Sequence, residues 1–273
     1  MKIELGQTTT HYELTGSGES LVLIHGFSDN LDLWQRQVPV FAEKYRVLTY
    51  DVRGHGRTES TDDRFSMDRL ADDLYALVAA LDLDRCHLLG FSMGGRIAAG
   101  FTLRHPDRVA SLILANSGIP GPGLQLSEEK KAEMAKRRQL MAQLVESGDN
   151  PAIAEIMTQL SFSPGIKERQ PDLFEQYKNL KLQNDPVHYG ALVQALMEGM
   201  ENPPDLTQIT CPTLVIAGEQ DSFMSREMAR SMEQALPRVE TVIFPTGHAA
   251  ALEMPDRFNR VVLDFLASLP TKG

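Results

Sequence analysis

One serine lies in a setting where it could act as a nucleophile. Ser92 stands between Gly90 and Gly94 in the segment GFSMG, with an apolar run before it and a helix-compatible run after it. A tight turn from a strand into a helix needs small residues two positions either side of the serine, and it holds the hydroxyl out at the end of the strand. Because GxSxG also arises by chance, a catalytic role requires partners elsewhere in the chain.

The first partner must be a base, because a serine hydroxyl is a weak nucleophile until its proton is removed, and histidine titrates near neutrality. Among seven histidines, His248 is the candidate, because it follows the last expected strand on a loop that begins PTG. Its loop should leave the same sheet edge as Ser92. The remaining histidines stand in glycine-flanked turns, in the strand before the serine, or away from any strand end: His25, His55, His87, His11, His105 and His188.

The second partner must be an acid that fixes the tautomer of the histidine and stabilises its charged form. Asp221 comes just after the expected strand 213–217, and Glu219 is a nearer but second-choice carboxylate. An acyl-transfer site also needs N–H donors for the oxyanion. The N–H of Met93, next to the serine, can supply one, and the N–H of Phe27 in the loop HGFSDN can supply another.

The elements that would position these residues alternate between strands and helices. Residues 3–5 and 11–14 read as an antiparallel pair, and short apolar runs predict buried strands at 21–24, 46–50, 86–89, 110–115, 213–217 and 240–244. Helical periodicity predicts helices at 67–81, with Ser66 as N-cap, and at 97–105 and 257–266. Such alternation is typical of a parallel sheet covered on both faces.

Residues 119–205 break this alternation, because they contain helical patterns but no convincing strand. Ser127 can cap a helix that runs to residue 147, and Pro151 and Pro186 favour helix starts. We therefore expect a core of residues 1–118 and 206–273 with a helical cap, residues 119–205, inserted in it. Five methionines fall in this region, for which core filling is favoured over an adaptable roof above a pocket: Met134, Met141, Met157, Met197 and Met200.

Composition narrows the class of protein. The net charge of −10 and the lack of a basic stripe argue against nucleic-acid binding. Cys86 and Cys211 form no disulfide framework or metal motif and are expected to be buried free thiols. No signal peptide and no apolar run of membrane-spanning length is visible, so we expect a cytoplasmic protein with no membrane span. Oligomeric state leaves no signature in the sequence.

The chain resembles the α/β-hydrolase fold proteins over nearly its full length. The resemblance rests on HGF (25–27), YDVRGHGRTES (50–60), GFSMGG (90–95), AGEQD (217–221) and GH (247–248), which follow one another in the family's order. It implies a mostly parallel eight-stranded sheet flanked by helices, with a helical cap, and a triad of Ser92, Asp221 and His248. The RGHG segment (53–56) is carried over as structural. Relatives with aspartate at the position of Ser92 use a different chemistry, which is not expected here.

The nearest subgroup is similar to carboxylesterases, 3-oxoadipate enol-lactonases and meta-cleavage C–C hydrolases. We expect a serine hydrolase that cleaves a small ester or lactone through an acyl-enzyme, with no metal or organic cofactor. C–C bond hydrolysis, a cofactor-free perhydrolase or haloperoxidase reaction, and a non-catalytic ligand receptor remain alternatives. Acidic substrates would need a cationic pocket residue, but interleaved glutamates favour a solvated helix face for Lys130, Lys131, Lys136, Arg137 and Arg138. Trp34 could line the acyl pocket, although a core anchor is favoured.

Overall fold

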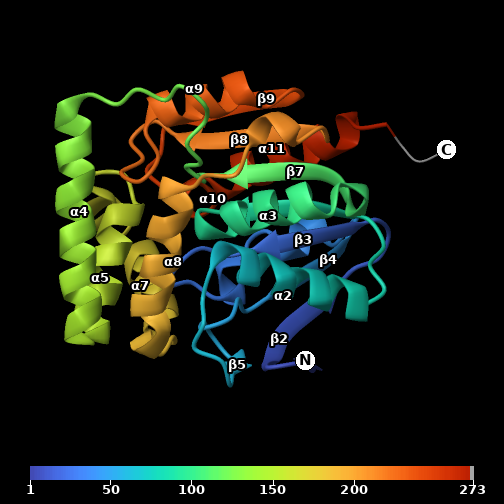
Figure 1. The fold of residues 1–273 in the computed structure, drawn as a ribbon, viewed down its shortest axis with the longest axis horizontal. Coiled ribbons are helices and arrows are strands. Elements are labelled where there is room, and N and C mark those ends of the chain that lie inside the picture. Colours follow the sequence, from blue (N-terminus) through green and yellow to red (C-terminus); the bar gives the residue numbers. More distant parts are fainter. Residues whose placement is uncertain (271–273) are drawn as a thin grey trace.

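The computed structural model describes residues 1–270, and its centre is a twisted sheet (Figure 1). Eight strands follow the order β1-β2-β4-β3-β6-β7-β8-β9, and a short strand β5 pairs with β2. All pairs from β4 to β9 are parallel, whereas β2 is antiparallel to its neighbours. The bounds are β1 Lys2–Leu5, β2 Thr8–Thr15, β3 Ser20–Ile24, β4 Arg46–Tyr50, β5 Glu59–Ser60, β6 Cys86–Phe91, β7 Val109–Ala115, β8 Thr213–Gly218 and β9 Val239–Phe244.

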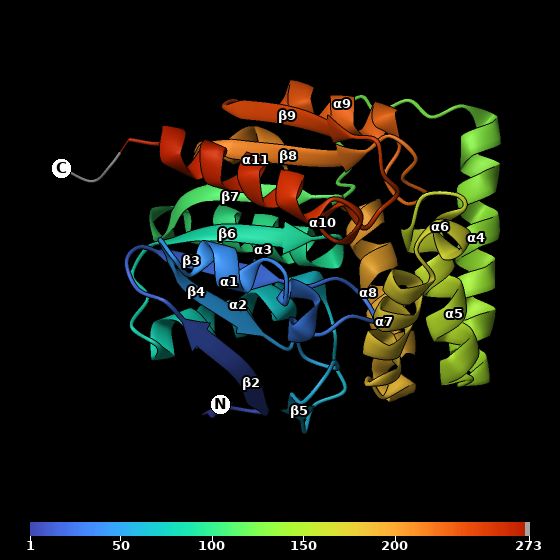
Figure 2. The same cartoon turned by 180° about the vertical axis from the view of Figure 1, so that it is seen from behind.

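Helices cover both faces of this sheet, as Figures 1 and 2 show from opposite sides. On one face lie α2 (Met67–Ala80), α3 (Met93–Arg104) and α9 (Arg226–Ala235), and on the other α1 (Val38–Phe41), α10 (Ala250–Glu253) and α11 (Pro255–Ser268). Successive residues of a strand point to opposite faces, so Leu88 and Leu89 of β6 join different hydrophobic clusters. Two apolar cores therefore hold the central strands rigidly between two helical layers.

Five further helices lie between β7 and β8 in the sequence: α4 (Glu128–Ser147), α5 (Asn150–Ser161), α6 (Ile166–Arg169), α7 (Pro171–Leu182) and α8 (Tyr189–Glu201). They gather beyond one end of the strands, on the left of Figure 1 and on the right of Figure 2. The Ser127 hydroxyl accepts the Lys130 N–H, as expected for the start of α4, and the helix ends at Gly148 in a left-handed conformation.

Most of the expected elements are confirmed. Residues 46–50 form β4 with the expected bounds, and Ser66 caps α2 by accepting the Arg69 N–H. The two-residue strand β5 and helix α9 were not expected: β5 lies within the RTES end of a glycine-rich turn, and α9 is a short, mostly polar helix that Ser225 caps and that buries one face through Met228, Ala229 and Met232. Trp34 is fully buried in the core, as favoured.

The expectation for the two cysteines is only half right. Cys86 is buried and free, and burial raises the pKa of its thiol to about 11, whereas Cys211 is only half-buried.

Across residues 1–270, the structure contains no helix with the length and apolar character that crossing a bilayer requires.

Candidate functional site

Ser92 lies in a strained turn between β6 and α3. Its backbone has φ 54° and ψ −115°, a conformation that non-glycine residues rarely adopt. The turn is so tight that a Cβ at Gly90 would lie 2.3 Å from the Gly94 carbonyl oxygen, and a Cβ at Gly94 would lie 2.2 Å from the Ile24 oxygen. The requirement for small residues on both sides of the serine is therefore confirmed. The turn places Ser92 at the carboxyl end of the strand, in the wall of a cavity.

His248 enters the same cavity from the loop between β9 and α10. The residue is 4% exposed, and its ring packs between the rings of Phe91 and Phe223, at centroid distances of 5.0 and 4.7 Å. The Gly247 N–H donates to the Glu253 carboxylate over 2.8 Å, which anchors the loop to α10. A glycine is needed at 247, because a Cβ there would lie 2.4 Å from the Phe162 carbonyl carbon.

Asp221 lies behind His248 and binds its ring. The Nδ1 atom of His248 lies 2.9 Å from each carboxylate oxygen of Asp221. The N–H groups of Phe223 and Met224 donate to one oxygen over 2.7 and 3.0 Å, and the Asn116 amide donates to the other over 3.0 Å. Glu219, the second-choice acid, instead forms an ion pair with Arg226 at the surface.

The hydrogen bond to Asp221 has a consequence for the histidine. With Nδ1–H donated to the carboxylate, Nε2 is the ring atom that remains to accept a proton. Ser92 and His248 line one cavity of about 180 Å³, although within residues 1–270 their side chains form no hydrogen bond to each other. Such bonds are often long in a free enzyme and shorten when substrate binds.

The expected oxyanion donors lie in the same wall. Phe27 and Met93 both line the cavity, and Met93 is the first residue of α3, whose N–H has no partner within the helix. The Phe27 N–H has no protein acceptor among residues 1–270. Residues with free N–H groups therefore line the cavity together with Ser92. Paired N–H donors are the kind of group that can stabilise an oxyanion.

Two buried histidines hold the loop that carries Phe27. The ring of His25 accepts the Val52 N–H over 2.9 Å, and the ring of His55 accepts the Ser28 N–H over 3.1 Å. Burial lowers the pKa of both histidines, so both stay neutral as hydrogen-bond acceptors. The structure therefore agrees with the expected structural role of the RGHG segment.

A buried ion pair ties this loop to α7. The Lys181 ammonium lies 2.6 Å from the Asp29 carboxylate, and both side chains are 1% exposed. The ammonium also donates to the Ser28 hydroxyl over 3.1 Å and lies 4.0 Å from the ring centroid of Tyr177. Lys181 is a residue that the sequence patterns did not single out, and it couples the inserted helices to the Phe27 loop.

Two expectations for the inserted helices need refinement. Met141 and Met157 belong to a buried apolar cluster, and Met134 and Met200 pack against it, as the favoured core-filling role predicts. The roof interpretation is supported as well, because all five methionines line the cavity: Met134, Met141, Met157, Met197 and Met200. The solvated-face interpretation holds for Lys131, which pairs with Glu128, for Arg137, which pairs with Glu133, and for Arg138, which is exposed. It is incomplete for the two arginines, because both also line the cavity.

Other polar residues of the cavity were missed as well as Lys181. Asn116 binds Asp221, Arg96 contributes a buried guanidinium, and Ser222 lies next to the acid. Asn116 and Ser222 adjoin a predicted strand end and Asp221, which is the only sequence signal that could have found them. Within residues 1–270, no group of three or more His, Cys, Asp or Glu side chains is arranged to hold a metal ion.

Comparisons with known proteins place the chain in a family. Residues 19–255 match the family described as alpha/beta hydrolase fold. The chain is 28% identical to 3-oxoadipate enol-lactonase 2 of Acinetobacter baylyi over 89% of this chain and 86% of that protein. It is 31% identical to a 2-hydroxy-6-oxononadienedioate/2-hydroxy-6-oxononatrienedioate hydrolase of Dechloromonas aromatica, over 94% of this chain and 90% of that protein.

Similarity to solved structures points to the same family. A thermophilic esterase from Thermogutta terrifontis, with malate bound, is similar at a TM-score of 0.85 and 26% identity over 99% of this chain and 100% of the esterase. The enol-lactonase of Burkholderia xenovorans is similar at a TM-score of 0.85 and 25% identity, over 98% of this chain and 100% of that one. The chain belongs to the α/β-hydrolase fold family.

Proposed function

We propose that the protein is a serine hydrolase that cleaves a small carboxylic ester or lactone through an acyl-enzyme on Ser92. The observation that carries this proposal is the bond from His248 to Asp221, 2.9 Å long, beside a strained serine turn in one cavity. The wall that holds Ser92 also carries the two free N–H groups. Nucleophile, base, orienting acid and oxyanion donors thus come together from four separate parts of the chain.

In the proposed reaction, Nε2 of His248 takes the hydroxyl proton while Ser92 Oγ attacks the substrate carbonyl carbon. The carbonyl oxygen becomes an oxyanion that accepts hydrogen bonds from the Phe27 and Met93 N–H groups. The histidine then gives its proton to the leaving alkoxide, and the acyl group stays on Ser92. Water, deprotonated by His248, then attacks the carbonyl carbon of the acyl-enzyme, and the carboxylic acid leaves Ser92, which regains its proton from His248. Asp221 holds the imidazole orientation and stabilises its charged form throughout.

We further propose that residues 119–205 act as the cap that shapes substrate choice. Its methionines form much of the cavity roof, and unbranched thioether side chains can adapt to different apolar groups. A cavity of about 180 Å³ favours short acyl groups. Exclusion of bulk water by this roof would strengthen the hydrogen bonds to the oxyanion.

A second candidate is hydrolysis of a C–C bond by the same residues. Two observations favour it: the 31% identical relative is named for a dienedioate substrate, and guanidinium groups line the cavity. A perhydrolase or haloperoxidase reaction is supported by a bromoperoxidase of Bacillus anthracis, similar at a TM-score of 0.87 and 25% identity. A non-catalytic receptor would bind ligand without turning it over.

Hydrolysis of p-nitrophenyl esters from acetate to octanoate tests the proposal, with Ser92→Ala as the blank. We expect turnover that favours short chains, is abolished in Ser92→Ala and His248→Ala, and is lost without a change in Tm. Substantial activity in Ser92→Ala would show that another residue is the nucleophile. If wild type turns over no ester or lactone and Ser92 reacts with no phosphonate, the hydrolase proposal is wrong.

A further inference from the structure

Arg96 is a buried cation with no anionic partner in residues 1–270. It lies on α3 one turn after Ser92, lines the cavity and is 9% exposed. Its guanidinium donates to the carbonyl oxygen of Gly118 and, over 3.3 Å, to that of Gly199, but no carboxylate of the described chain lies within 4.0 Å. Burial lowers the pKa of Arg96 to about 10, so it remains charged at neutral pH. A buried charge without a counterion is costly, and such groups are normally paired.

The cavity as a whole is cationic, in contrast to the chain. Its lining contains four basic side chains and one carboxylate, although the protein carries a net charge of −10. The carboxylate, Asp29, is already paired with Lys181, and Arg137 is paired with Glu133. Arg96 and Arg138 are therefore the two cavity cations that the described chain leaves unneutralised.

These two arginines come from different parts of the fold. Arg96 lies on α3, in the first turns after Ser92, whereas Arg138 is exposed on α4 in the inserted region, and both line the cavity. A rise of about 1.5 Å per residue places the Arg96 backbone about 6 Å along the helix from that of Ser92. A group bound at Arg96 would thus be within one small molecule's length of the reacting carbonyl.

We propose that Arg96 and Arg138 form a carboxylate-binding subsite, so that the substrate is an ester or lactone that carries a free carboxylate. This inference rests on the proposed function and names its substrate class. A planar guanidinium matches a carboxylate with two parallel N–H bonds, and such charge-assisted bonds are the strong ones. The carboxylate supplies the missing counterion of Arg96, and Arg138 at the cavity rim favours entry of anions over neutral esters.

A purely structural role for Arg96 makes a different prediction. Its two carbonyl bonds join the segment after β7 to α8, so a structural Arg96 would affect every substrate equally. A carboxylate subsite affects only anionic substrates. Monoethyl succinate and diethyl succinate separate these cases, because both release ethanol from the same four-carbon skeleton, and the free carboxylate of the first is a neutral ethyl ester in the second.

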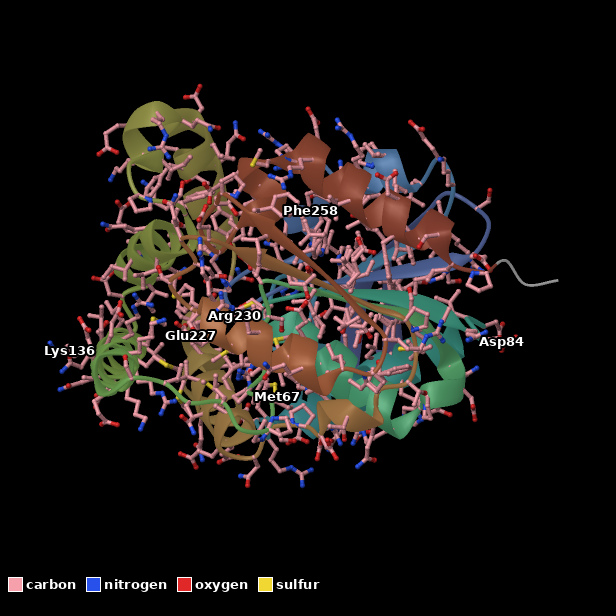
Figure 3. The ribbon with its side chains drawn as sticks, turned by 90° about the horizontal axis from the view of Figure 1, so that it is seen from above. Met67, Asp84, Lys136, Glu227, Arg230 and Phe258 are labelled. Atoms are coloured by element: carbon pink, nitrogen blue, oxygen red, sulfur yellow. The ribbon has the colours of Figure 1, made fainter. Side chains whose placement is uncertain are left out.

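We expect wild type to hydrolyse monoethyl succinate with the lower KM. Arg96→Met and Arg138→Met should each raise that KM about 10-fold to 100-fold, as expected for loss of a hydrogen bond to a charged group, and leave diethyl succinate nearly unchanged. Lys136→Met is the matched control, because Lys136 is an exposed cation of α4 that points away from the molecule in Figure 3 and does not line the cavity. It should change neither substrate.

Several outcomes would overturn the subsite. Equal KM values for the two esters in wild type would do so, as would an equal loss on both esters in Arg96→Met and Arg138→Met. If Arg96→Met fails to fold, Arg138→Met and Arg96→Lys replace it in the test. Arg96→Lys keeps the positive charge, so it should retain part of the preference for monoethyl succinate over diethyl succinate. If neither ester is turned over, calorimetric titration of wild type with succinate decides the question. Succinate binding that weakens in Arg138→Met but not in Lys136→Met supports the subsite and rejects only the proposed reaction. No succinate binding rejects both the subsite and the reaction.

Discussion

Asp221 differs from the other carboxylates near the cavity in the number of N–H groups that hold it. Two backbone N–H groups, the Asn116 amide and His248 all donate to it, and its side chain has no exposed surface. These bonds satisfy both oxygens and fix the plane of the carboxylate. The plane in turn sets the direction of the His248 ring and leaves Nε2 free of the carboxylate.

Asp221→Asn should lower kcat on the order of 10⁴-fold, because an amide NH₂ facing Nδ1 favours the tautomer that cannot take the serine proton. KM should change little, because Asp221 does not line the cavity. Glu219→Gln is the matched control, since Glu219 binds only Arg226 at the surface, and it should leave kcat intact. A larger loss in Glu219→Gln would transfer the role of the acid to that residue.

At the scale of single residues, sequence motifs predict the residues whose position is set by a fixed local turn. Ser92 between two glycines and His248 after the last strand both follow from spacing along one segment. Arg96 has no such signal, because its role depends on where Gly118, Gly199 and the wall of the cavity lie around it. The interleaved glutamates predict the solvated face that carries Arg137 and Arg138, but the contact of these two arginines with the cavity is set by the packing of α4, which no local pattern specifies.

At the scale of elements, buried strands were predictable and the placement of helices was not. Parallel strands covered on both faces are short, continuous apolar runs, so β3, β4 and β8 were found within about a residue. The inserted segments were expected to be helical, but the position of these helices relative to the sheet depends on a few side-chain contacts between the helices and the loops at the strand ends. The pair between Lys181 of α7 and Asp29 of the Phe27 loop is the most buried of these.

Lys181→Met tests this connection. It leaves the Asp29 carboxylate buried without a partner, which should lower the free energy of unfolding by about 3–5 kcal/mol. It should also lower kcat, because the Phe27 loop loses its anchor. Urea unfolding at pH 7 measures the first effect, with Lys131→Met as control, since its exposed pair with Glu128 is worth less than about 1 kcal/mol. Removing both charges, in Asp29→Asn with Lys181→Met, should recover part of the stability. Equal losses in the two single lysine variants would contradict the connection.

At the scale of the whole molecule, stability below neutral pH should depend on the two histidines that join the loops after β3 and β4. His25 and His55 are 0% and 2% exposed, and each accepts a backbone N–H. Burial lowers the pKa of both in the folded protein, whereas in the unfolded chain they titrate near 6.5. Below 6.5 the unfolded state therefore binds more protons than the folded state, so acid favours unfolding, by up to about 1.4 kcal/mol per pH unit for each histidine.

The prediction is a free energy of unfolding that falls as the pH is lowered from 7 to 5.5, with the loss beginning near 6.5. His55→Gln isolates the contribution of His55, because a glutamine oxygen can still accept the Ser28 N–H but takes up no proton in this range. The variant should be less stable than wild type at pH 7.5 and show a shallower loss down to pH 5.5, measured by urea unfolding at each pH. If His55→Gln retains the full wild-type slope, the acid sensitivity arises elsewhere in the molecule. If the variant alone loses catalysis at pH 7.5 while folded, His55 acts on the Phe27 loop rather than on global stability.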